Sequence, residues 1–211
     1  MNTARPTEPY PKPAYDERTA RSELGLLGDF AALIESVKQH WEQTYAPALP
    51  FQALELAVDL IGQHCIERPM NCLGDNQDED WRLSQRANID SGQVLAVVGT
   101  GNATYSSIAL NRSSVLQGIG NVFDEDLAGT ASAFSEPVDN ADRFYVQYFA
   151  RDCTGLAYCF EITEALIPKG ETVTFIERNY VVPGTARGAD SRQTLTPLVI
   201  VFDGKERPQS P

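Results

Sequence analysis

The stretch that decides the fold reads RFYVQYFA (residues 143–150), LAYCFEIT (156–163), ETVTFIERNYVV (171–182) and TLTPLVIVF (194–202). Each run is rich in Val, Ile, Thr, Tyr and Phe, the residues that fit best on a pleated, half-buried strand. Asp, Gly and Pro, which favour turns, lie between the runs. We therefore predict four strands that follow one another in a meandering, antiparallel sheet.

Both faces of these predicted strands carry apolar side chains. In the third run, Phe175 and Glu177 point to one face while Ile176 points to the other, because side chains alternate along a strand. A sheet that is apolar on both faces must be covered on both, or curl so that one face encloses a core or cavity. A partner protein, a ligand or a loop within residues 111–138 could cover the face that helices leave open.

Two apolar repeats nearer the N-terminus predict a pair of helices. The first lies within residues 16–45 and the second within residues 51–65, and in both the apolar side chains recur at spacings of three and four. The connector APALP (46–50) breaks the first helix, and so short a link predicts an antiparallel helical hairpin. The apolar face of the first helix consists of Leu26, Leu27, Phe30, Leu33, Ile34, Val37 and Trp41.

These elements predict one α+β domain over residues 16–206, with the helical hairpin packed on a curved, mainly antiparallel sheet of about six strands. A chain of 211 residues with 42% hydrophobic content is long enough for one sizeable core. Residues 1–15 are rich in proline and poor in apolar side chains, which predicts an extended arm. Residues 207–211 are expected to form a short C-terminal tail.

Residues 93–98 and 103–110 supply the two remaining predicted strands. The Gly-Thr-Gly sequence that starts at Gly99 invites comparison with a dinucleotide-binding loop, but the third glycine and the following helix of that motif are missing. We therefore expect a β-hairpin with a short turn between these two strands.

The segment 111–138 allows two interpretations. Ser113 or Ser114 could cap one short helix, and Asp124 could cap another. The alternative is a long ordered loop, which would be a candidate binding loop or lid.

The chain is acidic, with a formal net charge of −12 and a pI of about 4.6. Such a charge opposes broad affinity for nucleic acid or anionic lipid, because both need Lys and Arg to displace counterions. No window approaches the length of an apolar membrane span, and the N-terminus lacks the order of a secretory signal. We therefore expect a soluble, cytoplasmic protein without nucleic-acid or membrane partners.

The four cysteines are Cys65, Cys72, Cys153 and Cys159. The spacing within each pair is wider than the tight turn of a structural zinc site requires. Buried or free thiols are the preferred interpretation. Disulfides are the alternative, and they would require export from the cytoplasm.

No metal ion or cofactor is predicted. The acidic run in residues 75–80 lacks the glycine that a calcium-binding loop needs at its sixth position, so we interpret it as a surface loop. The two histidines, His40 and His64, lie at the edges of the predicted helical faces, and a metal site would need further ligands.

The first functional hypothesis is a non-catalytic binding or assembly subunit. The sequence contains no catalytic motif, and the predicted sheet has more apolar surface than one helical hairpin covers. The Pro-rich arm is of a kind that a neighbouring protein or a second copy of the chain could order. The candidate binding residues are Tyr10, Tyr15, Tyr145, Tyr158 and Arg178.

The second hypothesis is a cofactor-independent enzyme that acts on a small molecule, such as an isomerase, cyclase or hydrolase. Polar residues that alternate with aromatic ones on an apolar sheet suit a small-molecule pocket. If Glu161 and Glu177 shared a dry cavity, one carboxyl group would have a raised pKa and could act as general acid or base. Tyr180 would polarise the substrate. This hypothesis requires that both carboxylates face one enclosed cavity.

Overall fold

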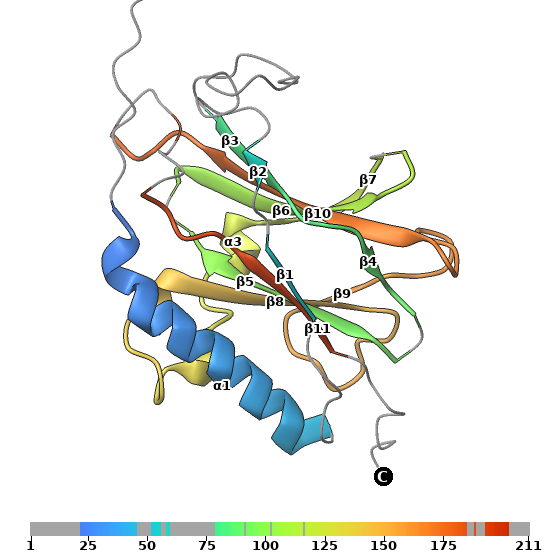
Figure 1. The fold of residues 1–211 in the computed structure, drawn as a ribbon, viewed down its shortest axis with the longest axis horizontal. Coiled ribbons are helices and arrows are strands. Elements are labelled where there is room, and N and C mark those ends of the chain that lie inside the picture. Colours follow the sequence, from blue (N-terminus) through green and yellow to red (C-terminus); the bar gives the residue numbers. More distant parts are fainter. Residues whose placement is uncertain are drawn as a thin grey trace, which may run out of the picture.

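The computed structural model describes residues 22–45, 52–55, 58–59, 79–90, 92–101, 103–115, 117–184, 188 and 193–202 (Figure 1). In these ranges the chain forms two β-sheets that lie face to face. Helix α1 (Leu27–Tyr45) packs against the outer face of one sheet, and a 3-10 turn, η1 (Leu24–Leu26), leads into it. The α+β class is therefore confirmed.

The first sheet, which α1 covers, has the strand order β1-β11-β5-β8-β9. Its neighbouring strands are antiparallel except for β8 and β9, which are parallel. The strands are β1 (Gln52–Glu55), β11 (Leu198–Phe202), β5 (Val94–Thr100), β8 (Phe144–Ala150) and β9 (Cys159–Glu161).

The second sheet has the order β2-β3-β10-β6-β7, with β4 beside β10, and all of its pairs are antiparallel. The strands are β2 (Val58–Asp59), β3 (Glu79–Leu83), β10 (Thr172–Tyr180), β6 (Tyr105–Arg112), β7 (Gln117–Phe123) and β4 (Ala87–Asn88). Three short helical elements lie between β7 and β8: α3 (Asp124–Leu127), η2 (Ser132–Phe134) and η3 (Ala141–Arg143).

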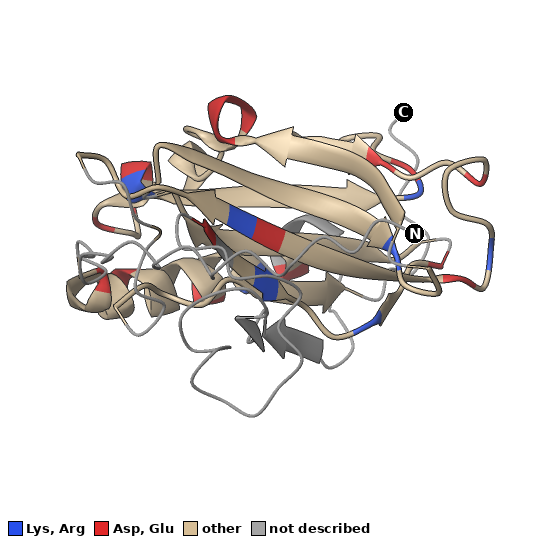
Figure 2. Ribbon diagram, turned by 90° about the horizontal axis from the view of Figure 1, so that it is seen from above, with Lys and Arg blue, Asp and Glu red and all other residues tan. Residues whose placement is uncertain are grey.

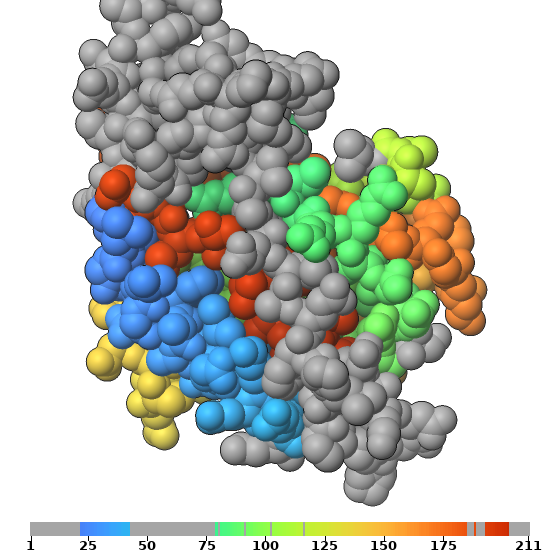
Figure 3. Space-filling model, in the orientation of Figure 1, coloured from blue at the N-terminus to red at the C-terminus, as the bar shows by residue number. Residues whose placement is uncertain are grey.

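The central strands of the first sheet contribute to two hydrophobic cores. Alternate residues of β5 and β8 face either the second sheet or α1, so every residue of these two strands is buried. Figure 3 shows α1 lying directly against residues near the C-terminal strand. One face is therefore covered by a single helix, where a helical hairpin was expected. The other face is covered by the second sheet of the same chain.

The predicted helical hairpin and single six-strand sheet are not found. Part of the expected second helix forms β1 and β2, which pair with β11 and β3, so backbone pairing between strands overrides the helical spacing of a short segment. The remainder of that segment lies outside the described residues. On α1, the predicted apolar face is buried at Phe30, Leu33, Val37 and Trp41, whereas Leu27 is exposed.

The four C-terminal runs do form strands, but they do not form a meander. β8, β9 and β11 belong to the first sheet, whereas β10 lies in the second. The predicted hairpin of residues 93–98 and 103–110 is also wrong, because β5 and β6 lie in different sheets. β5 is buried on both faces and pairs with β11 and β8, so the chain must cross to the other sheet after it.

The segment after β6 differs from both predicted forms at its start. Residues 113–115 form a turn and β7 follows it, so no helix begins at Ser113 or Ser114. A short helix, α3, is found where Asp124 was expected to act as a cap, but Asp124 is its first helical residue, Phe123 is the N-cap and no side chain caps it. Further along the chain between β7 and β8, Ala131, Phe134 and Val138 pack with α1 in the hydrophobic core on the outer face of the first sheet.

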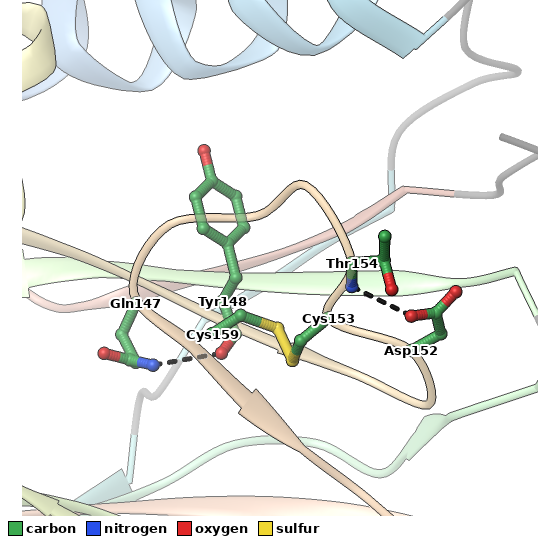
Figure 4. Close-up of a disulfide and its surroundings, with 6 residues drawn as sticks. All are labelled: Gln147, Tyr148, Asp152, Cys153, Thr154 and Cys159. Carbon is green, nitrogen blue, oxygen red and sulfur yellow. Dashed lines mark hydrogen bonds between the residues drawn. A yellow bond between two sulfur atoms is a disulfide. The ribbon is translucent and has the colours of Figure 1, made fainter. Parts of the chain in front are cut away.

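Cys153 and Cys159 form a disulfide, which corrects the expectation of free thiols for this pair (Figure 4). Their Cα atoms are 5.7 Å apart, within the range that a disulfide can span. The bond ties the start of β9 to the loop that brings the chain back beside β8. Cys65 and Cys72 lie outside the described residues. No helix in the described part of the chain is long and apolar enough to cross a membrane.

Candidate functional site

A cluster of buried polar side chains lies between the two sheets, at the end where β5 crosses over to β6. Glu177 of β10 and Arg82 of β3 are directly paired across their strands and face the first sheet. Tyr145 reaches the same place from β8. Glu177 and Tyr145 are each 2% exposed, so the cluster is shielded from water.

The carboxyl group of Glu177 has a hydrogen-bond donor among the described residues for only one of its two oxygen atoms. The Tyr145 hydroxyl donates to its Oε1 at 3.3 Å, and Arg82 Nη1 lies 3.5 Å from its Oε2. Oε2 accepts no hydrogen bond from the described residues although it is buried. A void of about 10 Å³ beside it has room for about one water molecule.

Arg82 is held by the chain segment that precedes β11. Its Nη1 donates to the carbonyl oxygen of Leu195 at 2.6 Å, and its Nη2 donates to the hydroxyl of Thr194. Glu23 fixes the same segment from the N-terminal side: one carboxylate oxygen accepts from the Leu195 N–H at 2.8 Å and from Thr100 Oγ1 at 2.9 Å. The guanidinium group is therefore positioned by its hydrogen bonds to Leu195 and Thr194, and its contact with Glu177 is an ion pair.

Burial raises the pKa of Glu177 to about 7, because a carboxylate loses its hydration between the sheets. Arg82 lowers that pKa and the charge of Glu23 raises it, while hydrogen bonds from Tyr145 and Asn179 lower it. Burial, followed by the charge of Glu177, raises the pKa of Tyr145 well above its ordinary value. Near neutral pH, Tyr145 therefore stays protonated, while Glu177 is present in both its protonated and its ionised form.

Tyr145 also lines a pocket of about 230 Å³ at the same end of the molecule. Glu177 does not line this pocket, so Tyr145 links the pocket to the buried carboxyl group. Gly99 makes the position of Tyr145 possible, because a Cβ atom at Gly99 would overlap the tyrosine hydroxyl. The rest of the lining is mixed, with the polar residues Ser106, Asp124, Asp142 and Arg143 and the apolar residues Ala103, Leu127, Ala128 and Phe144, together with Gly101.

The predicted catalytic residues are not brought together. Glu161 lies on β9 in the first sheet and is exposed, whereas Glu177 lies on β10 and is buried. Tyr180 is 36% exposed, and the alternation along β10 turns it to the face opposite Glu177. The shared dry cavity that the sequence interpretation required for the two glutamates is therefore absent. Tyr145, which we predicted as a binding residue, stands beside Glu177 instead.

The other predicted binding residues lie apart from this cluster. Arg178 points to the outer face of the second sheet, where it pairs with Glu79 and lies 5.6 Å from the centre of the Trp81 ring. Tyr158 lies just before β9 and is 49% exposed. Tyr10 and Tyr15 are outside the described residues.

Charged side chains are sparse along most of the described strands and gather in the loops and on the helix (Figure 2). The buried pair of Glu177 and Arg82 is therefore unusual for this molecule. In the described part of the chain, no three His, Cys, Asp or Glu side chains lie close enough to hold a metal ion. His40 is exposed on α1, with its ring 5.8 Å from that of Phe134, and His64 lies outside the described residues.

Sequence reasoning missed Arg82 and Glu23. Arg82 follows the acidic run of residues 75–80 and lies in β3, and Glu23 stands alone near the start of the helical pattern. One signal was available in the Gly-Thr-Gly sequence, since Gly99 makes room for Tyr145 and Gly101 lines the pocket.

Comparison with protein-family models, with curated proteins and with solved structures finds no match. The function of this chain is therefore argued from the chemistry of its own residues.

Proposed function

We propose that this protein is a cofactor-independent enzyme that transfers a proton to and from a small molecule bound beside Tyr145. One observation carries the proposal: Tyr145 lines the pocket, and its hydroxyl donates to the carboxyl group of Glu177. The pocket is therefore connected to a buried group that can hold or release a proton near neutral pH.

In this proposal Tyr145 relays the proton. A bound substrate gives a proton to the phenol oxygen, and the hydroxyl proton of Tyr145 passes to Glu177 Oε1 in the same step. The positive charge of Arg82 limits the cost of the carboxylate form before the transfer. The reverse step returns a proton to a different substrate atom and restores the enzyme. An isomerase or an intramolecular cyclase fits this cycle better than a hydrolase, because neither needs a second reactant.

The test is hydrogen exchange on candidate substrates. We would incubate the protein in heavy water with small carbonyl compounds and hydroxy acids, and follow loss of substrate C–H signals by NMR. We expect the wild type to catalyse exchange on one class of compound and Tyr145→Phe to slow it by about 100-fold or more. Tyr148→Phe is the matched control, because Tyr148 lies on the same strand but faces α1. Equal rates for Tyr145→Phe and wild type would disprove the relay.

A second candidate function is protein binding, and the outer face of the second sheet favours it. Aromatic side chains gather there on adjacent strands around Arg178, which lies 5.7 Å from the ring of Tyr105. Phe123 is 41% exposed and Tyr180 is 36% exposed. Aromatic residues and arginine are the residue types enriched in protein interfaces. The members of this face are Trp81, Tyr105, Phe123, Arg178 and Tyr180.

In this second proposal the Pro-rich arm of residues 1–15 docks on a partner or a second copy, together with that face. Deletion of residues 1–15 is expected to leave the melting temperature nearly unchanged and to abolish assembly. Light scattering of the full chain and the truncated chain would measure the mass of both. A truncated protein that assembles as the full chain does would remove the arm from the proposal.

A further inference from the structure

The void beside Glu177 lies at the end of the molecule where β5 crosses over to β6. We infer that this void holds one ordered water molecule, which donates to Glu177 Oε2 and carries protons between Glu177 and the solvent. The place of the water follows from the geometry of the void, whereas its part in proton transfer rests on the proposed function.

Glu177 Oε2 is the polar atom that needs an occupant in the void. It is buried and accepts no hydrogen bond from the described residues. Arg82, which lies beside Oε2, lines the void, whereas Tyr145, the donor to Oε1, does not. Oε2 is therefore the carboxyl oxygen on the side of the void. A buried carboxylate oxygen without a donor costs free energy, and the O–H group of a water molecule supplies one.

The size of the void suits water and little else. Its volume of about 10 Å³ corresponds to one water-sized sphere. An organic ligand or a hydrated ion is larger than this. The occupant must therefore be a single small molecule or a bare ion.

The charges of the inner wall select a neutral molecule. Glu23, Arg82 and Glu177 form this wall, and each is at most 4% exposed. A bare cation would lie beside the guanidinium group, and an anion would lie beside two carboxyl groups. Arg82 has five N–H groups and gives two of them to Leu195 and Thr194, so others remain for a water oxygen to accept from. Water can both accept from Arg82 and donate to the carboxyl groups, which meets the two to four polar partners that a buried water needs.

The outer wall of the void places this water close to the solvent. Ala103, Asn179 and Thr194 line the void and are only half-buried. Protonated Glu177 gives its proton to the water oxygen, and the water passes one of its own protons to the solvent, which leaves the carboxylate and restores the water. The reverse step returns a solvent proton. Glu177 thus meets Tyr145 through Oε1 and the solvent through Oε2.

A high-resolution crystal structure of the full chain tests the water directly. We expect one density peak in the void, at about 2.6–3.2 Å from Glu177 Oε2. A void without density, or a protein group that donates to Oε2, would overturn the inference. A peak with contacts of about 2.4 Å to several oxygen atoms would be a metal cation and would overturn it as well.

Two substitutions of Ala103 test what the water does to Glu177. Ala103→Val fills the void, and we expect the pKa of Glu177, measured by NMR of its carboxyl carbon, to rise by about 1–2, because a hydrogen bond from water favours the carboxylate. Ala103→Ser also displaces the water but brings a hydroxyl donor in its place, so the pKa should stay close to that of the wild type. Ala109→Val is the matched control, since Ala109 is a half-buried alanine of β6 that does not line the void.

The melting temperature and crystal structure of each variant show whether its fold is intact and its void filled. An unchanged pKa of Glu177 in a folded Ala103→Val protein with a filled void would contradict the hydrogen bond to Oε2. An equal rise in Ala109→Val would do the same. If Ala103→Val does not fold, the wild-type density and the pKa in Ala103→Ser decide the matter.

The part of the water in proton transfer is measured with a compound that the exchange screen identifies as a substrate. In heavy water the wild type should place deuterium in the product at most turnovers, and Ala103→Val should place at least about 3-fold less per turnover, because Glu177 then returns the substrate's own proton. Deuterium per turnover is the useful quantity, since Ala103 also lines the pocket beside Tyr145 and its substitution changes the rate. Equal deuterium content would disprove the route but not the water. If the wild type acts on no compound in the screen, the proposed function and the route fall together, while density and pKa still decide whether the water is present.

Discussion

Glu177 and Arg178 are neighbours on β10, and each forms an ion pair with a residue of β3, but they point to opposite faces of the second sheet. The inner pair, Glu177 with Arg82, has both side chains almost fully buried. In the outer pair, Glu79 is buried but the side chain of Arg178 is 39% exposed. The same residue types on the same two strands thus meet two different environments.

The two glutamates respond in opposite directions. For Glu177, burial outweighs the attraction of Arg82, so its pKa rises to about 7. For Glu79, burial also acts to raise the pKa, but hydrogen bonds from Arg178 and Trp81 outweigh it and the net pKa is lowered. Both oxygens of Glu79 accept hydrogen bonds, whereas Oε2 of Glu177 accepts none from the described residues. The balance between burial and hydrogen bonding, more than the presence of an arginine, therefore sets the direction in which each pKa moves.

The largest effect is expected from Arg82→Met, which removes the charge of the inner pair. At pH 8 the variant leaves a buried carboxylate without its counter-ion, and we expect a loss of about 3–5 kcal/mol in the free energy of unfolding. At pH 5 the loss should be smaller, because Glu177 is then protonated and neutral. Urea denaturation at both pH values measures the difference.

The double variant Arg82→Met/Glu177→Leu is the control for that experiment. It removes both charges, so it should recover part of the stability that Arg82→Met loses at pH 8. If the double variant is no more stable than Arg82→Met, the loss comes from the hydrogen bonds of Arg82 to Thr194 and Leu195 and not from the unpaired carboxylate.

Glu177→Gln should change how stability depends on pH. The folded pKa of Glu177, about 7, lies above its ordinary value of 4.5, so the folded protein binds the proton more tightly than the unfolded chain does. Stability from this group is therefore greatest below pH 4.5 and is lost as the pH rises toward 7. The shift corresponds to roughly 3 kcal/mol.

The glutamine variant has no proton to lose, so this pH dependence should disappear from its unfolding curves. NMR of the carboxyl carbon of labelled glutamate would measure the pKa of Glu177 directly. A titration at the ordinary value would remove the physical basis of both the comparison and the proposed proton relay.

Much of the fold could be predicted from local pattern. The composition of the C-terminal runs predicted strands that the structure contains, and alternation along β10 placed Phe175 and Glu177 on one face. The pairing of those strands could not be predicted, because it depends on contacts between distant segments. β5 and β8 are apolar on both faces. This pattern indicates that the strands are buried, but it does not indicate which strands lie beside them.

The candidate site could be predicted only in part, because it too depends on contacts between distant segments. Glu177 and Tyr145 were singled out as polar residues on apolar strands, but their proximity depends on two sheets meeting face to face. The contact of Arg82 with Leu195 spans 113 residues of sequence, and that of Glu23 with Leu195 spans 172. No local spacing rule connects residues so far apart. Glu161 was wrongly paired with Glu177 because β9 and β10 were expected to be neighbours in one sheet.

Gly99→Ala should disturb the inner face alone. The new Cβ atom displaces the Tyr145 hydroxyl, at an expected cost of about 1–3 kcal/mol in stability. The pKa of Glu177 should rise further, because the hydrogen bond from Tyr145 lowers it. Gly28→Ala is the control, since nothing lies within 4 Å of the added atom. An unchanged pKa of Glu177 in Gly99→Ala would show that Tyr145 does not influence the carboxyl group.

Arg178→Met should have the smallest effect. The partly exposed guanidinium group is screened by water, so we expect a loss of about 1 kcal/mol or less at pH 7. The lowered pKa of Glu79 means that its contribution is present at neutral pH and is lost as the pH falls, the opposite of Glu177. Urea denaturation of Arg178→Met and wild type at pH 7 and pH 3 should therefore show a difference that shrinks in acid. If Arg178→Met destabilises the protein as much as Arg82→Met does, burial does not distinguish the two faces. The proposal that Glu177 is the reactive carboxyl group would then lose its support.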